Sequence, residues 1–217
     1  MDAIAPLSVL APPPPAQEDM EALRERVLRC AETCFVHQGF HVTTMDAIAR
    51  DARCSKKTIY KLFSSKGELF NALLTRFRLE IGQLRVDPDW EPGHAIRYFL
   101  EAMADILLRD RSVALVRIAM SEAGRMEMSN PALNSSASAI ARSGLEDYLA
   151  ELQRRGSHDV GEPIEATRML IGMALGAFHH ELLTGLKAEV PRQELLARIE
   201  QAVRIFLRGT QCVGAAA

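Results

Sequence analysis

Apolar residues recur at three- and four-residue intervals along most of the chain, which is the period of an α-helix. The pattern is clear over residues 22–35, where the apolar positions share one face and Gly39 follows as an expected C-cap. It is equally clear over residues 66–84, and Pro88 and Pro92 are expected to stop that helix. Between these two long helices the pattern predicts two short ones.

The second half of the chain has the same period. From residue 93 onwards the chain is again helical, with one apolar face over residues 96–107 and a further apolar stretch over 113–120. Helices are also predicted over residues 138–152, 163–184 and 191–208. Two glycines and a proline predict a loop at residues 156–163. No stretch shows the alternation of apolar and polar residues that is typical of a strand. The sequence therefore predicts an all-α protein of about nine helices.

Composition narrows the class of protein. Of the 217 residues, 48% are hydrophobic and 25% are charged, which is typical of a globular chain with a buried core. No apolar run approaches the roughly 18 residues of a membrane span, and Asp2 stands where a signal peptide carries basic residues. We therefore expect a cytoplasmic protein without a membrane partner. Residues 1–17, with Pro12–Pro15, are predicted to be a disordered arm, and residues 129–136 a loop or helix boundary.

The net charge of −2 hides an asymmetry. Residues 50–66 contain six basic residues and one acidic residue, a net charge of +5. Residues 18–85 together carry +3, so the remainder of the chain carries −5. A basic end on an acidic body is typical of a protein that binds a polyanion with that end only.

The basic stretch overlaps a pattern typical of a helix-turn-helix, TMDAIARDARCSKKTIYKLF at residues 44–63. Two short helices are predicted there, with Thr44 beginning the first, Ser55 as the N-cap of the second and a tight turn near residues 52–54. Four apolar side chains can fix one helix across the other: Ile48, Ala52, Ile59 and Phe63. Such a unit places its second helix in the major groove of DNA.

Eight side chains are candidates for contact with DNA. Lysines and hydroxyls bind phosphate oxygens, and the first turn of the second helix can reach base edges. Lys66, at the start of the next helix, is expected to clamp the flanking backbone. The candidates are Thr44, Ser55, Lys56, Lys57, Thr58, Tyr60, Lys61 and Lys66. From the charge pattern alone, a solvated lysine-rich surface helix is an equal alternative.

Four groups of residues make the pattern more specific. They are Gly39-Phe40, Thr44-x-x-x-Ile48-Ala49, Ser55-Lys56-x-Thr58-Ile59-Tyr60-x-x-Phe63 and Ser65-Lys66-x-Glu68-Leu69. With this spacing, residues 39–74 resemble the N-terminal domain of TetR-type transcriptional regulators. The resemblance implies a helix-turn-helix DNA-binding domain over residues 18–65 and a helical ligand-binding and dimerisation domain over residues 66–217.

Two positions depart from the pattern of that family. The turn commonly carries glycine and a small aliphatic residue, whereas this chain has Arg53 and Cys54. Either Arg53 takes a positive φ and strains the turn, or the turn avoids that conformation. Lys57 replaces a residue that is small in many relatives and adds a charge at the DNA-facing side, which leaves the operator sequence open.

The segment FLEAMADILLRDRSVALVRIAMSEAGR, residues 99–125, resembles the C-terminal domains of regulators grouped with repressors of multidrug efflux genes. The resemblance implies a two-fold homodimer and a cavity for a small, apolar inducer. Candidate dimer residues on the last two helices are Met169, Met173, Ala177, Ile199, Val203 and Phe206. Candidate ligand residues are Phe77, Phe99, Met103, Leu107, Met120, Tyr148 and Phe178. For both sets the alternative is packing within the chain's own core.

The resemblance implies ligand-controlled repression by a dimer on a pseudo-palindromic, double-stranded operator. Inducer binding would shift the long helix that begins at Lys66 and so lower the affinity for DNA. An enzyme is disfavoured, because the sequence has no Gly-rich phosphate loop, GxSxG elbow or HExxH motif, and we expect no cofactor. The remaining alternative is a helical interaction protein that does not bind DNA.

The four cysteines, Cys30, Cys34, Cys54 and Cys212, lack the paired spacing of a zinc site, so we expect no bound metal. They are either buried thiols in a reducing compartment or parts of a redox sensor, which would require exposed, reactive sulfur.

Overall fold

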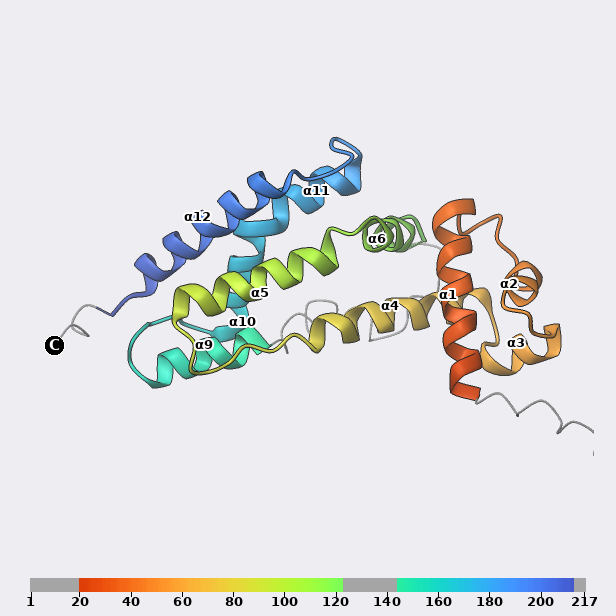
Figure 1. The fold of residues 1–217 in the computed structure, drawn as a ribbon, viewed down its shortest axis with the longest axis horizontal. Helices are drawn as coiled ribbons and strands as arrows, with labels where there is room; N and C mark the ends of the chain where they lie inside the picture. Colours follow the sequence, from red (N-terminus) through yellow and green to blue (C-terminus); the bar gives the residue numbers. More distant parts are fainter. Residues whose placement is uncertain (1–19, 123–143, 213–217) are drawn as a thin grey trace, which may run out of the picture.

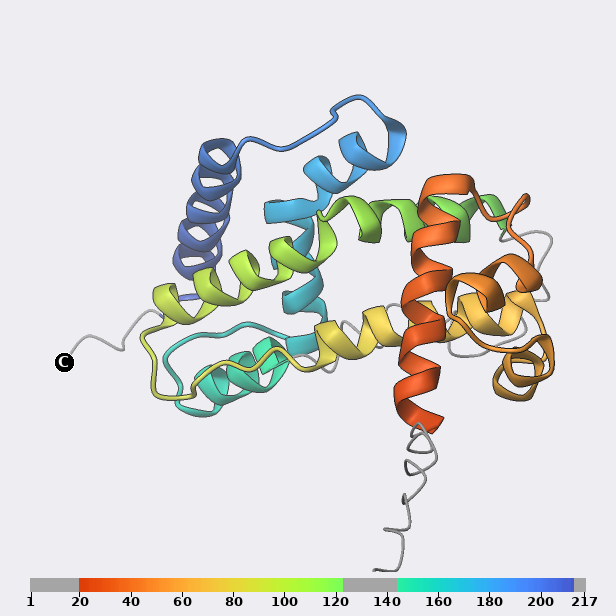
Figure 2. The same ribbon diagram turned by 45° about the vertical axis from the view of Figure 1, so that its right-hand side comes forward.

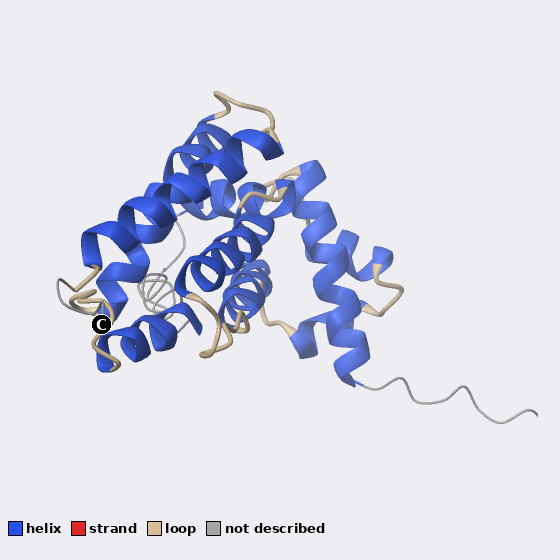
Figure 3. Cartoon of the chain, turned by 60° about the vertical axis from the view of Figure 1, so that its left-hand side comes forward, coloured by secondary structure: helices blue, strands red, loops and turns tan. Residues whose placement is uncertain are grey.

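The computed structural model describes residues 20–122 and 144–212, which form an all-α fold (Figures 1 and 3). The helices are α1 (Met20–Gln38), α2 (Met45–Asp51), α3 (Lys56–Leu62), α4 (Lys66–Gly82), α5 (Pro92–Leu107), α6 (Asp110–Glu122), α9 (Gly144–Arg154), α10 (Pro163–Ile171), α11 (Ala177–Thr184) and α12 (Arg192–Thr210), with a π-helical turn, η1 (Gly172–Gly176), between α10 and α11. The predicted all-α class is therefore confirmed. The predicted arm at residues 1–17, the loop at 129–136 and the start of the helix predicted at 138–152 lie outside the described residues.

The first three helices and half of α4 share one hydrophobic core, which we call the head (Figure 1, right). The head helices begin where the sequence predicts them, because hydroxyl side chains accept hydrogen bonds from backbone N–H groups in the first turn. Thr44 caps α2, Ser55 caps α3 and Ser65 caps α4. At the other end of α1, Gly39 has φ +95°, as its predicted role as C-cap requires.

The remaining helices surround a second hydrophobic core, which we call the body (Figure 2). Helix α5 lies in its middle and buries Ile96, Phe99 and Leu100 completely. Helices α9, α10 and α12 cover it, each through apolar residues at helical spacing. None of the described helices combines the length and the apolar composition that crossing a membrane requires.

The helix predicted at residues 163–184 is continuous from α10 through η1 to α11, because the residues on either side of the π-turn keep right-handed helical angles. A π-turn adds one residue to a helical turn and rotates the residues that follow it. The rod ends at Gly185, whose φ is +77°. Counted as one helix, the rod brings the described residues to nine helices, in agreement with the prediction.

Helix α4 belongs to both cores. Leu69, Phe70 and Leu73 are buried in the head, whereas Ile81 is buried in the body. The helix ends at Gly82, before the two prolines that were expected to stop it. Pro92 was assigned the wrong role: it begins α5, where its missing N–H costs nothing.

Helix α6 is a second connection between head and body. Its Leu115 is buried in the head core, and the helix packs against both α1 and α11. The Arg117 guanidinium donates hydrogen bonds to the carbonyls of Leu182 and Leu183 at the end of α11. Head and body are therefore joined through α6 as well as through α4.

Candidate nucleic-acid interface

The turn between α2 and α3 forms with Arg53 in the left-handed region, at φ 51°. Its N–H donates to Arg50 O at 3.0 Å, and the Cys54 N–H donates to Ala49 O at 2.9 Å. Arg26 of α1 stabilises the turn, because its Nε donates a hydrogen bond to Ala52 O at 2.7 Å. Of the two possibilities left open by the sequence, the turn thus adopts the strained one.

Replacing Arg53 with glycine should stabilise the head by about 0.5–1 kcal/mol, because glycine takes a positive φ without steric cost. Urea unfolding of the variant and the wild type measures this difference. Arg53→Ala is the matched control, since it removes the same charge and keeps the Cβ. An equal gain in both variants would show that charge repulsion, and not backbone strain, was relieved.

The predicted core of the helix-turn-helix is confirmed. Ile48, Ala52 and Ile59 have no exposed surface, and Phe63 is 2% exposed. The guanidinium of Arg24 lies 5.2 Å from the centre of the Phe63 ring and covers it from α1. This core fixes α3 across α2, so the outer face of α3 has a defined direction.

The outer face of α3 presents cations to solvent. Lys57, Tyr60 and Lys61 are exposed, and Tyr60 keeps 44% of its surface. No hydrogen bond or ion pair within residues 20–122 and 144–212 holds the ammonium of Lys57 or Lys61. These two lysines are therefore available to a polyanion.

The two hydroxyls at the start of α3 have a structural role. Ser55 Oγ accepts the Thr58 N–H at 3.0 Å and lies 2.7 Å from Thr58 Oγ1. Thr44 Oγ1 similarly accepts the Ala47 N–H at 3.2 Å. All three hydroxyls lie at the N-termini of α2 and α3, where helix dipoles and free N–H groups attract phosphate.

Lys56 is less available than the sequence indicates. Its Nζ lies 2.9 Å from Asp46 Oδ2, and both side chains are more than half exposed. The hydrogen bond to the Asp46 carboxylate raises the pKa of Lys56 above its usual value. The pair ties the start of α2 to the start of α3 and cancels one of the predicted DNA-facing charges.

The predicted role of Lys66 as a clamp on the DNA backbone is not supported. Its Nζ donates to three carbonyls of the α1–α2 loop: Phe40 O at 2.7 Å, His41 O at 3.2 Å and Thr43 O at 3.0 Å. The ammonium also lies 4.5 Å from the centre of the Phe40 ring. Burial lowers the pKa of Lys66, and the nearby Glu122 carboxylate acts in the opposite direction. Sequence spacing could not reveal these contacts, because they join residues more than 20 positions apart.

The predicted ligand residues fall into three groups. Phe99, Met103, Tyr148 and Phe178 are buried in the body core, and Phe77 and Leu107 pack partly buried against it. The Tyr148 hydroxyl donates to Trp90 O at 2.8 Å, and burial raises the pKa of Tyr148 to about 12. Met120 was wrongly included: it lies near the end of α6 and is 65% exposed.

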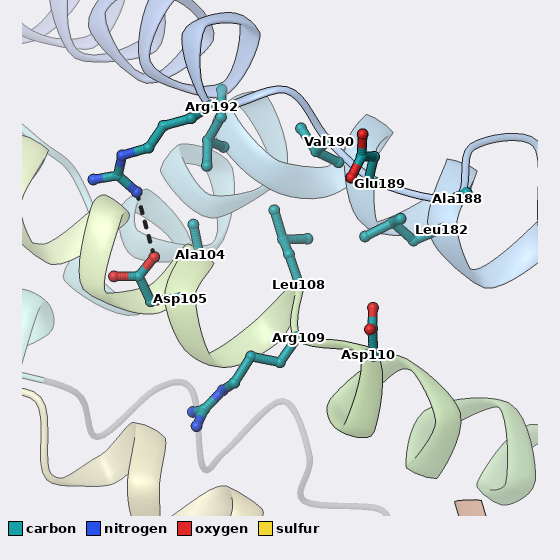
Figure 4. A pocket seen from close by; sticks show the side chains of 11 residues that line it. Ala104, Asp105, Leu108, Arg109, Asp110, Leu182, Ala188, Glu189, Val190 and Arg192 are labelled. Atoms are coloured by element: carbon teal, nitrogen blue, oxygen red, sulfur yellow. Dashed lines mark ion pairs between the residues drawn. The ribbon is translucent and has the colours of Figure 1, made fainter. Parts of the chain in front are cut away.

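A cleft of about 280 Å³ opens where the end of α5 meets α11 and the segment before α12 (Figure 4). None of the predicted ligand residues lines it. Arg192 and Asp105 lie 3.6 Å apart at one rim, while Arg109 points away from the cleft and pairs with Glu80 of α4. The lining residues are Ala104, Asp105, Leu108, Arg109, Asp110, Leu182, Ala188, Glu189, Val190, Arg192 and Leu195.

The predicted dimer residues separate into two groups. Ile199, Val203 and Phe206 are at most 7% exposed and pack in the chain's own body core, so their assignment to an interface is wrong. The i, i+3/i+4 spacing of α12 indicates only that these residues share a face. Met169 is 63% exposed and Ala177 is exposed, while Met173 is partly buried. The exposed strip of the α10–η1–α11 rod comprises Met169, Gly172, Gly176, Ala177 and His180, with the partly buried Met173 between them.

The cysteines of the head have the chemistry of packing residues. Cys34 is buried, and its Sγ donates to Asp51 Oδ2 at 3.4 Å. Burial raises the pKa of Cys30 and Cys54, and burial together with Asp51 raises the pKa of Cys34 to about 11. A redox sensor needs the opposite shift, toward thiolate, so the structure favours buried thiols.

Two family models match the chain. Residues 27–73 match the model of bacterial regulatory proteins of the tetR family. Residues 94–209 match the C-terminal domain of the AefR-like transcriptional repressors. The second match alone covers more than half of the chain.

Curated relatives agree with these matches. The transcriptional repressor SCO4008 of Streptomyces coelicolor is 36% identical over 75 residues, which span 34% of this chain and 39% of that protein. The transcriptional regulator YvkB of Bacillus subtilis is 24% identical over 199 residues, covering 88% of this chain and 98% of its own.

Solved structures share the whole architecture. A TetR-family regulator from Mesorhizobium loti superposes with a TM-score of 0.75 at 20% identity, covering 90% of this chain and all of that one. The flavonoid-responsive regulator FrrA superposes with a TM-score of 0.69 at 26% identity over 91% of this chain and all of its own. The complex of SmeT with triclosan superposes with a TM-score of 0.63 at 22% identity, over 90% of this chain and 95% of that one.

Proposed function

Because the chain belongs to the TetR family and is a DNA-binding transcriptional regulator, we propose that it is a repressor, released from its operator by a small, apolar ligand. Residues 18–65 bind DNA in this proposal, and residues 66–217 bind the ligand and form a homodimer. The operator is double-stranded and pseudo-palindromic, because a two-fold dimer presents two equivalent recognition helices. The site of action is the cytoplasm, where the DNA lies.

The observation that carries the proposal is the outer face of α3. Lys57 and Lys61 stand exposed and without partners within the described residues, on a helix fixed by a fully buried core. In this proposal Lys57, in the first turn, reaches base edges, while Tyr60 and Lys61 bind the phosphate backbone. Thr44, Ser55 and Thr58 bring helix N-termini and hydroxyls to the same phosphates.

A gel shift at two salt concentrations tests DNA binding, with the DNA upstream of the gene as probe and a pool of random duplexes as a second source of operators. Tight binding that weakens steeply with salt is expected, because lysine–phosphate contacts release counterions. Failure to select any duplex from the random pool would favour the helical interaction protein.

The homodimer is proposed to form on the exposed strip of the α10–η1–α11 rod. Gly172 and Gly176 leave open space beside the strip, so a partner helix can approach closely. Met169 and Ala177 supply apolar surface that otherwise faces water. The proposed dimer surface also includes the exposed side of α12. An open groove lies there, lined by Leu196, Ala197 and Arg204.

Met169→Glu should weaken the dimer at least 100-fold, because a carboxylate without a partner would be buried at the interface. Sedimentation equilibrium measures the dissociation constant. Leu186→Glu is the matched control, since Leu186 is 74% exposed and lies outside the strip. Equal dissociation constants for the two variants would place the interface elsewhere.

The ligand is proposed to bind within the body among Phe99, Met103, Tyr148 and Phe178, beside Phe77 and Leu107. Two buried polar atoms in the body, Thr167 Oγ1 and His179 Nε2, have no hydrogen-bond partner among the described residues, and a ligand with polar groups would satisfy them. FrrA responds to flavonoids and SmeT binds triclosan, so two structural relatives recognise small aromatic molecules. The cleft beside Leu108 and Leu182 is the proposed route of entry.

A further inference from the structure

Helix α6 ends against the head with a buried carboxylate. Glu122, its last residue, is 3% exposed, and Glu122 Oε1 lies 2.8 Å from His41 Nε2 in the loop between α1 and α2. The His41 side chain itself is 63% exposed. Glu122 Oε1 accepts no hydrogen bond from the described residues, so its burial is offset only by nearby positive charge, from a protonated His41 and from the Lys66 ammonium. Glu122 therefore favours the position of this loop that keeps both groups close.

The same loop is anchored from α4. The Lys66 ammonium donates to the carbonyls of Phe40, His41 and Thr43, as described above. The Thr43 side chain is 1% exposed, and its Oγ1 donates to Gly39 O at 2.7 Å. The next residue, Thr44, is the N-cap of α2. The position of this short loop therefore sets where α2 begins and, through the shared core, how α3 is presented.

Helix α6 can carry a displacement from the body to this loop. Its head-facing residues Leu115, Ile118 and Glu122 recur at three- and four-residue spacing, and the first two pack on the head core. The Arg117 guanidinium donates hydrogen bonds to two backbone carbonyls at the end of α11. Figure 2 shows α6 passing from the neighbourhood of α11 to α1. Because a packed helix moves as a unit, a shift at α11 reaches Glu122.

We propose that Glu122 is a positioning residue for DNA binding: through His41 it holds the α1–α2 loop, and so passes the position of α6 to the recognition unit. The inference rests on the proposed DNA binding. In this inference the contact between Glu122 and His41, which does not involve α4, couples the body to the head. Glu122 touches no DNA in this account and acts only through the loop.

The sign of the effect of Glu122→Gln distinguishes this proposal from simple electrostatics. Removing a negative charge that lies against the basic head by itself favours a polyanion and would tighten binding. Weakening the hold of Glu122 on His41 instead lowers the affinity for DNA. Because every lysine–phosphate pair remains in this variant, the dependence of log Kd on log salt should stay unchanged.

The test compares Glu122→Gln, His41→Gln and the double variant on a duplex selected by the wild-type protein. Each single variant should raise the operator Kd about tenfold, and the double variant should be no weaker than either, because both changes break the same interaction. Asp147→Asn is the matched control, since it removes the same charge from an exposed position on α9, far along the chain from the head, and should leave Kd unchanged. Circular dichroism verifies that each variant is folded.

Several results would overturn the inference. Equal or tighter binding by folded Glu122→Gln would do so, as would additive losses of affinity in the double variant or an equal loss in Asp147→Asn. If Glu122→Gln does not fold, the operator Kd of His41→Gln tests the inference instead. The His41 side chain is largely exposed, so this variant is expected to fold. A salt slope lowered by about one per protomer in that variant would make His41 a phosphate-binding residue instead. Absence of DNA binding by the wild-type protein would refute the proposed function itself.

Discussion

Replacing Lys57 and Lys61 with alanine is expected to weaken operator binding by roughly 10²–10³-fold at physiological salt. A dimer would lose four lysines from its DNA-facing surface, at about 1 kcal/mol for each lysine that binds DNA. Both lysines are exposed on α3, and neither supports the core of the head. The salt slope should fall by about one for each phosphate that the variant no longer neutralises, which salt titration of the gel shift measures.

The matched control removes two charges from the body. Arg154 and Arg155 lie near the end of α9 and are exposed. Their replacement by alanine should leave affinity and salt slope close to those of the wild type. Comparable losses of affinity in both double variants would mean that net charge alone governs binding, and would refute α3 as the recognition helix.

Lys56→Ala, added to the variant that lacks Lys57 and Lys61, should lower the affinity for DNA less than Lys57→Ala or Lys61→Ala does. Lys56 is already paired with Asp46 at 2.9 Å, so its charge is partly cancelled before DNA arrives. A further loss of affinity of less than about threefold is expected. A loss as large as that caused by Lys57→Ala would show that Lys56 leaves Asp46 to bind DNA directly.

Ile59→Ala should strongly destabilise the head, by about 2–5 kcal/mol. Ile59 is the only buried residue within α3, and it has no exposed surface. Its truncation leaves a cavity beneath the recognition helix and loosens the hold of the head core on it. Thermal unfolding should show the head melting at least about 8 °C lower, and operator binding should be lost at about 37 °C.

Val42→Ala is the control for this loss of apolar volume. Val42 is also in the head, but it is 70% exposed, so its truncation should change stability by less than about 0.5 kcal/mol. Unchanged unfolding of Ile59→Ala would mean that α3 is held by its flanking turns and not by the core that it shares with α2.

The sequence by itself determined the elements of the head. The hydroxyl residues Thr44 and Ser55 mark helix starts because their side chains satisfy backbone N–H groups only a few positions away. Ile48 and Ile59 mark the core because burial at helical spacing is a local pattern. Because these causes act over a few residues, the sequence alone predicts them. The all-α class and the family could be predicted from the sequence in the same way.

Tertiary structure decided which side chains remain available. The sequence does not distinguish Lys56 and Lys66 from Lys57 and Lys61. In the fold, however, Lys56 is paired with Asp46, and Lys66 donates to carbonyls of the α1–α2 loop. The sequence does not indicate such partners, because ion pairs and caps across loops join residues 10 to 26 positions apart.

The same cause explains the assignments that failed. Helical periodicity places Ile199, Val203 and Phe206 on one face of α12, but only packing shows that this face is turned into the chain's own core. Met120 likewise has an apolar side chain that the fold leaves in solvent. The sequence thus determined which residues form helices and which share a face. The tertiary structure decided what each face meets, because that depends on the positions of distant helices, such as α6 resting on α1.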